Sequence, residues 1–63
     1  MPLVTIDMWE GRSIEQKRQL VKDITAAVCK MGPPPEAVTI LIRDVPRQNW
    51  AIAGNLSCDA PPK

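Results

Sequence analysis

The side chains that most enzymes use for acid–base catalysis are scarce in this sequence. Histidine and tyrosine are absent, and there is neither a glycine-rich phosphate loop nor a cysteine–histidine pair. One unusual candidate stands at the start of the chain, where Pro2 follows Met1 directly. If Met1 is removed, Pro2 carries a free secondary amine, and an α-amino group titrates close to neutral pH. Burial beside apolar groups and arginines would lower the pKa of that amine, so that it could act as a general base.

A second interpretation of Pro2 needs no chemistry. Proline at position 2 can simply begin a strand, and if Met1 is retained the proline nitrogen is an amide that cannot accept a proton. The residue type alone leaves both interpretations open.

Composition excludes several other classes of function. Two cysteines without any histidine cannot form the usual four-ligand zinc site, and we expect neither a metal nor a cofactor. A net charge of +1 does not indicate a nucleic-acid-binding surface, and no apolar run is long enough to cross a membrane. The N-terminus also lacks the basic and apolar regions of a secretory signal. We therefore expect a cytoplasmic protein with no nucleic-acid or membrane partner.

The segment that must position Pro2 is a predicted strand over residues 3–9. Alternation places its side chains on two faces, with Val4, Ile6 and Met8 on one and Leu3, Thr5, Asp7 and Trp9 on the other. Both faces carry apolar side chains, which indicates a strand that is covered on two sides. Residues 10–12 then form a connecting loop.

A long amphipathic helix is predicted to follow that loop. Ser13 and Gln16 have the spacing of a capping box, in which each side chain bonds the backbone of the other residue. Apolar residues then recur with a helical period from Leu20 onward. Gly32 and the three prolines after it cannot continue a helix, so we expect the helix to run from about Ile14 to Met31.

The remainder of the chain predicts a second strand and a short arm. Residues 38–45 are rich in β-branched residues, and a helix between two strands makes a β-α-β unit with parallel strands. Residues 46–49 are expected to turn, and residues 50–56 to form a small hairpin or arm. The fold class is therefore α/β (α+β), as a single domain over residues 1–63 with a flexible tail at 57–63.

Such a unit is too small to be stable alone. A chain of 63 residues without phenylalanine or tyrosine has little bulky core material. A two-stranded sheet with one helix also leaves open edges and an uncovered face. Both arguments predict that the protein is an oligomer.

The order of these features resembles the 4-oxalocrotonate tautomerase family. The resemblance is carried by Pro2, by Glu-Gly-Arg-Ser and Glu-Gln-Lys over residues 10–17, and by an arm from Trp50 to Gly54. It covers nearly the whole chain, from Pro2 to about Leu56. It implies a β-α-β protomer, a hexamer built as a trimer of dimers, sites shared between subunits, and an N-terminal proline exposed by removal of Met1.

The resemblance also implies roles for three residues. Pro2 matches the catalytic amine that moves a proton between carbons of an enol or α,β-unsaturated 2-oxo acid. Arg12 matches the arginine that grips a substrate carboxylate, a task suited to its planar bidentate fork. Trp50 stands at the place of an aromatic residue in the wall of the site, although packing at an interface would explain it equally well.

One position departs from the family. The best-known members carry a second arginine on the second strand, and the aligned residue here is Thr39. Arg43 shares the parity of Thr39 but lies four residues further on, whereas Arg47 in the following turn could reach a site at a subunit boundary. The Trp50 indole or a backbone N–H is another possible donor. We therefore expect an enol substrate with one carboxylate, which needs only Arg12 as its anchor.

Two other functions stay open at this point. A hydratase or dehalogenase of the same superfamily would keep Pro2 cationic, but it needs a carboxylate to activate water and none is clearly placed. A non-catalytic subunit that completes a mixed hexamer would explain both a retained Met1 and the missing second arginine. The intact mass of the natively expressed chain separates these cases, because proline catalysis requires that Met1 be absent.

Overall fold

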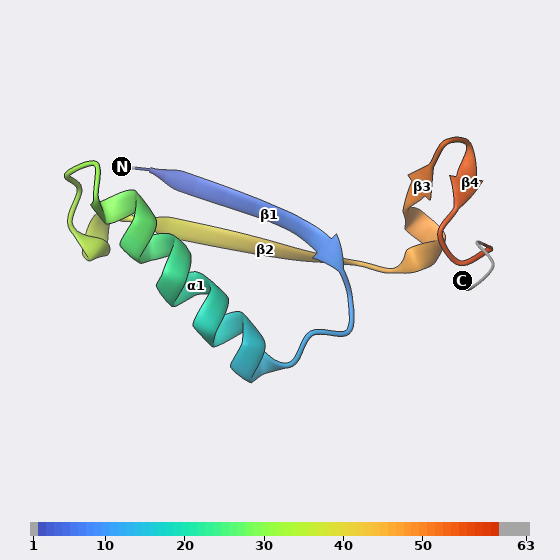
Figure 1. Ribbon diagram of the computed structural model, residues 1–63, viewed down its shortest axis with the longest axis horizontal. Coiled ribbons are helices and arrows are strands. Elements are labelled where there is room, and N and C mark those ends of the chain that lie inside the picture. The colour runs from blue at the N-terminus through green and yellow to red at the C-terminus, as the bar shows by residue number, and fades with distance from the viewer. Residues whose placement is uncertain (1, 60–63) are drawn as a thin grey trace.

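The computed structural model describes residues 2–59, which form one helix, two pairs of strands and two short 3-10 helices (Figure 1). The elements in chain order are β1 (Leu3–Trp9), α1 (Ile14–Cys29), η1 (Pro35–Ala37), β2 (Thr39–Val45), η2 (Arg47–Asn49), β3 (Ala51–Ile52) and β4 (Asn55–Leu56). The predicted β-α-β unit with a small C-terminal hairpin is confirmed.

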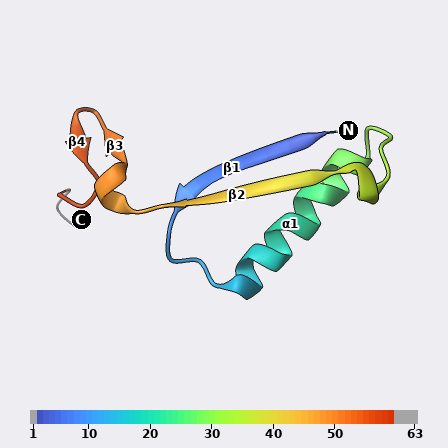
Figure 2. The same cartoon turned by 180° about the vertical axis from the view of Figure 1, so that it is seen from behind.

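The strands β1 and β2 pair in parallel, in a register that runs from Leu3 opposite Thr39 to Trp9 opposite Val45. The helix lies on one side of this sheet and leads the chain back toward the start of β1 (Figures 1 and 2). On β1 the even-numbered residues are half-buried and the odd-numbered ones exposed. The alternation predicted for residues 3–9 is therefore observed, with one face of the strand covered and the other open.

The helix begins where its capping box predicts. The Gln16 N–H donates to the Ser13 hydroxyl over 3.1 Å, and the Ser13 N–H donates to the Gln16 side-chain oxygen over 2.9 Å. Its end was predicted two residues too late, because α1 stops at Cys29 rather than Met31. The N–H groups of Met31 and Gly32 bond carbonyls only three residues back, so the chain tightens into turns that satisfy the last helical carbonyls.

The arm formed by β3 and β4 is a separate antiparallel pair beyond the end of β2 (Figure 1). Its two-residue loop has positive φ at both positions, 54° at Ala53 and 83° at Gly54, as tight hairpin loops require. The Ser57 N–H donates to the Trp50 carbonyl over 2.7 Å, which ties the base of the arm together. Of the flexible tail predicted at 57–63, residues 60–63 lie outside the described part of the chain.

No residue between positions 2 and 59 is fully buried within the single chain. The open face of the sheet carries Leu3 and Leu41, which are 63% and 47% exposed, and the arm carries Ile52 at 61%. In the same part of the chain, no helix is long and apolar enough to cross a membrane. The single chain therefore presents apolar surface on its sheet and arm instead of enclosing a core.

Candidate active site

The loop between β1 and α1 places Arg12 at the carboxyl end of β1. Gly11 has a φ of +119°, a conformation that side chains disfavour, so glycine suits this turn. On one side of the turn, the Glu10 N–H donates to the Val45 carbonyl at the end of β2 over 3.1 Å. On the other side, the capping box of Ser13 starts α1. Arg12 is thus an exposed side chain on a loop whose backbone is fixed on both sides.

A hollow of about 420 Å³ opens beside this loop, and three of the predicted site residues line it. Its walls are Met8, Trp9, Glu10, Gly11, Arg12, Arg47 and Trp50. The structure therefore brings Arg12, Arg47 and Trp50 together, although they come from the loop after β1, from η2 and from the start of the arm. The charged side chains are two guanidiniums and one carboxylate, so the net formal charge is one positive.

The indole of Trp9 contacts two of the other residues that line this hollow, Trp50 and Arg47. The rings of Trp9 and Trp50 meet edge to face, with centroids 6.0 Å apart and planes at 76°. The guanidinium carbon of Arg47 lies 4.5 Å from the centroid of the Trp9 ring, within the range of a cation–π contact. Sequence reasoning missed Trp9, because strand alternation describes it only as a residue on one face. Its place as the last residue of β1, beside the Arg12 loop, was the available signal.

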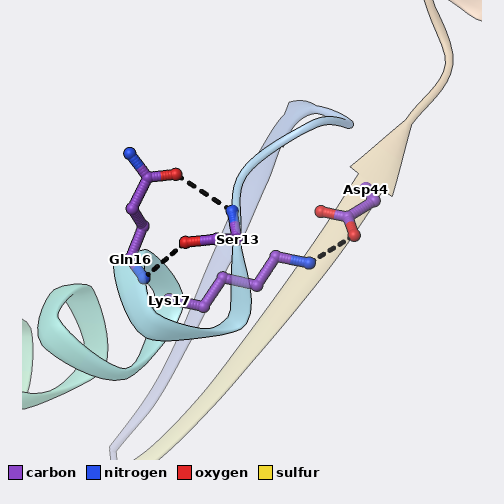
Figure 3. Close-up of polar contacts among 4 residues, drawn as sticks. All are labelled: Ser13, Gln16, Lys17 and Asp44. Atoms are coloured by element: carbon purple, nitrogen blue, oxygen red, sulfur yellow. Dashed lines mark hydrogen bonds and ion pairs between the residues drawn. The ribbon is translucent and has the colours of Figure 1, made fainter.

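A smaller hollow of about 210 Å³ also borders Arg12, and it is lined by Met8, Arg12, Gln16, Lys17 and Leu20. The Lys17 ammonium forms an ion pair with the Asp44 carboxylate at the end of β2 (Figure 3). Arg12 therefore borders two hollows, one lined with indoles and the other lined by the first turn of α1.

Pro2 lies far from this group within the same chain. It precedes β1, whereas Trp9 ends it, and seven residues of strand span about 23 Å at roughly 3.3 Å each. Figure 1 shows the start of β1 and the arm at opposite ends of the sheet. The Pro2 carbonyl accepts a bond from the Thr39 N–H over 3.0 Å, which holds it at the start of β2. One chain alone does not place Pro2 and Arg12 around one small molecule.

The position of the missing second arginine lies beside Pro2. Thr39 is opposite Leu3 in the sheet register and is exposed. Arg43 is on the same open face but pairs with Asp7, directly opposite, at 3.7 Å. It lies four residues along β2 from Thr39 and two residues before the strand end at Val45. Within residues 2–59 no three His, Cys, Asp or Glu side chains come together in a way that could hold a metal ion.

Comparison with known proteins agrees with this architecture. A profile of tautomerase enzymes matches residues 2–60. A 2-hydroxymuconate tautomerase from Comamonas testosteroni is 46% identical over 55 residues, which cover 86% of this chain and 87% of that protein. The crystal structure of YwhB, a homologue of 4-oxalocrotonate tautomerase, superposes with a TM-score of 0.91 at 38% identity, over 95% of this chain and all of the other.

A further likeness is to a heterohexamer 4-oxalocrotonate tautomerase from Chloroflexus aurantiacus. Its TM-score is 0.90 at 34% identity, and the match covers 97% of this chain and 100% of that one. The fold and the extent of these matches define a tautomerase-type β-α-β protein. The chain belongs to the 4-oxalocrotonate tautomerase family, as its sequence pattern predicts.

Proposed function

We propose that this protein is a cofactor-independent tautomerase that interconverts the enol and keto forms of a 2-oxo acid, or moves a double bond in one. The observation that carries the proposal is the hollow in which Arg12, Arg47 and Trp50 meet, in a chain of the tautomerase family. Arg12 grips the substrate carboxylate through a charge-assisted bidentate contact. The indoles of Trp9 and Trp50 shield the bound substrate from water.

The proposed reaction is a proton transfer that leaves the composition of the substrate unchanged. The neutral amine of Pro2, freed by removal of Met1, takes the proton from the enol hydroxyl. As the C=O bond forms at one carbon of the C=C bond, the other carbon takes a proton from the protonated Pro2 amine. The amine is then neutral again, and no cofactor or co-reactant is needed.

The distance between the two ends of β1 supports a site built from more than one chain. Because Pro2 and Arg12 are separated by about the length of the strand, a second copy must bring its Pro2 to the hollow of the first. Leu3, Leu41 and Ile52 leave apolar surface available for such contacts. We propose a homohexamer, arranged as a trimer of dimers, as the active form, working in the cytoplasm, where the free thiols of Cys29 and Cys58 stay reduced.

The charges of the hollow favour a substrate with one carboxylate. Two guanidiniums and the carboxylate of Glu10 line it, and Thr39 contributes no cation at the Pro2 end. If Arg12 holds the carboxylate, Arg47 is the remaining cation that could polarise the carbonyl oxygen. We therefore expect faster ketonisation of phenylenolpyruvate than of the diacid 2-hydroxymuconate. A clear preference in kcat/KM for the diacid would contradict this assignment.

The experiment that tests the function combines intact mass with turnover. The natively expressed protein should have a mass lower by one methionine and should ketonise phenylenolpyruvate. The Pro2→Ala variant should be slower, because a primary amine on a flexible backbone replaces the ring nitrogen. Quantitative retention of Met1, or a processed protein that turns over neither enol, would overturn the proposal.

A second candidate is a subunit of a mixed hexamer, which the likeness to a heterohexameric relative favours. In that assembly another chain would supply the cation that Thr39 does not. Native mass measurement of this chain purified alone separates the two candidates. A homogeneous active hexamer supports the first, and an inactive protein that gains activity only with a second chain supports the second.

A further inference from the structure

An ion pair joins the first turn of α1 to the end of β2, across 27 positions of the sequence. Lys17 contributes the ammonium and Asp44 the carboxylate, and their side chains are 26% and 38% exposed. Figure 3 shows the Lys17 side chain reaching from the first turn of the helix toward Asp44 on the strand. The register places Asp44 opposite Met8, next to the strand end from which the Arg12 loop departs.

The backbone around Arg12 is anchored by this pair as well as by hydrogen bonds. Before Arg12, the Glu10 N–H is held by the Val45 carbonyl. After it, Ser13 is fixed by the reciprocal bonds of the capping box. The capping-box bonds lie within the start of α1, whereas the Lys17–Asp44 pair joins that first turn to the sheet. The pair is therefore a polar contact that ties the first helical turn, and the Arg12 loop before it, to the strands.

Charge gives the pair a second effect. Lys17 and Arg12 line the same small hollow. Asp44 neutralises the ammonium and so occupies a cation that could otherwise compete for a substrate carboxylate.

We infer that Lys17 and Asp44 form a positioning pair that orients Arg12 for carboxylate binding, an inference that rests on the clamp role proposed for Arg12. Neither side chain touches the substrate. Removing either partner breaks the same contact between α1 and the sheet. Asp44→Asn and Lys17→Met should therefore weaken carboxylate binding to a similar degree, and the double variant should be no worse than either single variant.

The same helix turn offers a matched control. Glu15 and Arg18 form an ion pair at 2.6 Å, with side chains 82% and 63% exposed. This pair links neighbouring turns of α1 and makes no connection to the sheet. Glu15→Gln changes one charge in the same way as Asp44→Asn but should leave Arg12 undisturbed, since exposed pairs contribute little.

The test measures binding and turnover separately. Benzoate binding is followed through tryptophan fluorescence, because both tryptophans of the chain line the hollow, and benzamide serves as the uncharged counterpart. We expect Asp44→Asn to raise the Kd for benzoate and the KM for phenylenolpyruvate by roughly threefold to tenfold, with kcat and benzamide binding unchanged. Asp44→Glu should restore the original Kd. Equal loss for benzoate and benzamide, or an Asp44→Asn variant that matches Glu15→Gln, would overturn the inference.

The outcomes also separate this inference from the proposed function. If the protein binds benzoate through Arg12 and loses affinity in Asp44→Asn but turns over neither enol, the tautomerase proposal fails and the positioning pair stands. If turnover depends on Arg12 while Asp44→Asn has the same benzoate Kd and phenylenolpyruvate KM as Glu15→Gln, the positioning pair fails and the proposed function stands.

Discussion

At its start, β1 offers a half-buried proline whose carbonyl is held by Thr39 and whose neighbour Leu3 faces outward. At its end, the same strand offers indoles, guanidiniums and a carboxylate around one hollow. The first end has the proposed base Pro2, and the second has Arg12, the group proposed to bind the substrate carboxylate. If Pro2 and Arg12 act together as proposed, this difference means that the site is split between two ends about 23 Å apart and is completed by assembly.

Blocking the amine at the first end should have the largest effect. A lysine inserted between Met1 and Pro2 prevents removal of Met1 and converts the proline nitrogen into an amide. We expect kcat/KM for phenylenolpyruvate to fall by about 10²–10⁴, the contribution of a general acid–base group. A lysine added after Lys63 is the control for charge and should change nothing. Undiminished turnover by the blocked protein would show that Pro2 is not the base.

Removing the clamp at the second end should have the next largest effect. Arg12→Ala should lower kcat/KM about 10- to 100-fold, mainly through KM, because a hydrogen bond to a charged group contributes about 1.5–3 kcal/mol. The kcat/KM of Arg12→Lys should lie between those of Arg12→Ala and the original protein, since lysine keeps the charge and loses the bidentate geometry. Arg18→Ala, on the exposed side of α1, is the control. An Arg12→Ala protein with the original KM would place the carboxylate elsewhere.

Arg47 tests whether the second end also supplies the oxyanion donor. We expect Arg47→Met to lower kcat roughly tenfold while KM changes little, because an exposed guanidinium is worth less than an enclosed donor. Trp9→Phe keeps an aromatic face under Arg47, so its kcat should stay close to the original value. Trp9→Leu removes that face, so its kcat should fall toward that of Arg47→Met. If all three variants match the original protein, Arg47 takes no part in the reaction.

Local patterns in the sequence predicted the elements well. The alternation over residues 3–9 matches β1, and the Ser13–Gln16 spacing marks the start of α1. The end of α1 was missed by two residues, because the tightened turns at Met31 and Gly32 depend on hydrogen bonds that apolar periodicity does not report. Local signals thus predict where an element begins better than how its last turn closes.

The hollow was harder to predict than the elements. Trp9 and Arg47 meet across 38 positions of sequence, and only the parallel register of β1 and β2 brings η2 to the end of β1. No spacing in the chain indicates that contact. The separation of Pro2 from Arg12, by contrast, follows from the length of a seven-residue strand, and strand geometry alone is enough to derive it.

The measurement that tests the division of the site most directly is complementation between two inactive proteins. The form blocked at Pro2 is mixed with Arg12→Ala, unfolded together and reassembled in equal amounts. If each site takes Pro2 from one chain and Arg12 from another, about a quarter of the sites receive both intact groups, and about a quarter of the original activity should return. Activity no greater than the average of the two separate proteins, in an assembly shown by native mass to be mixed, would contradict a shared site.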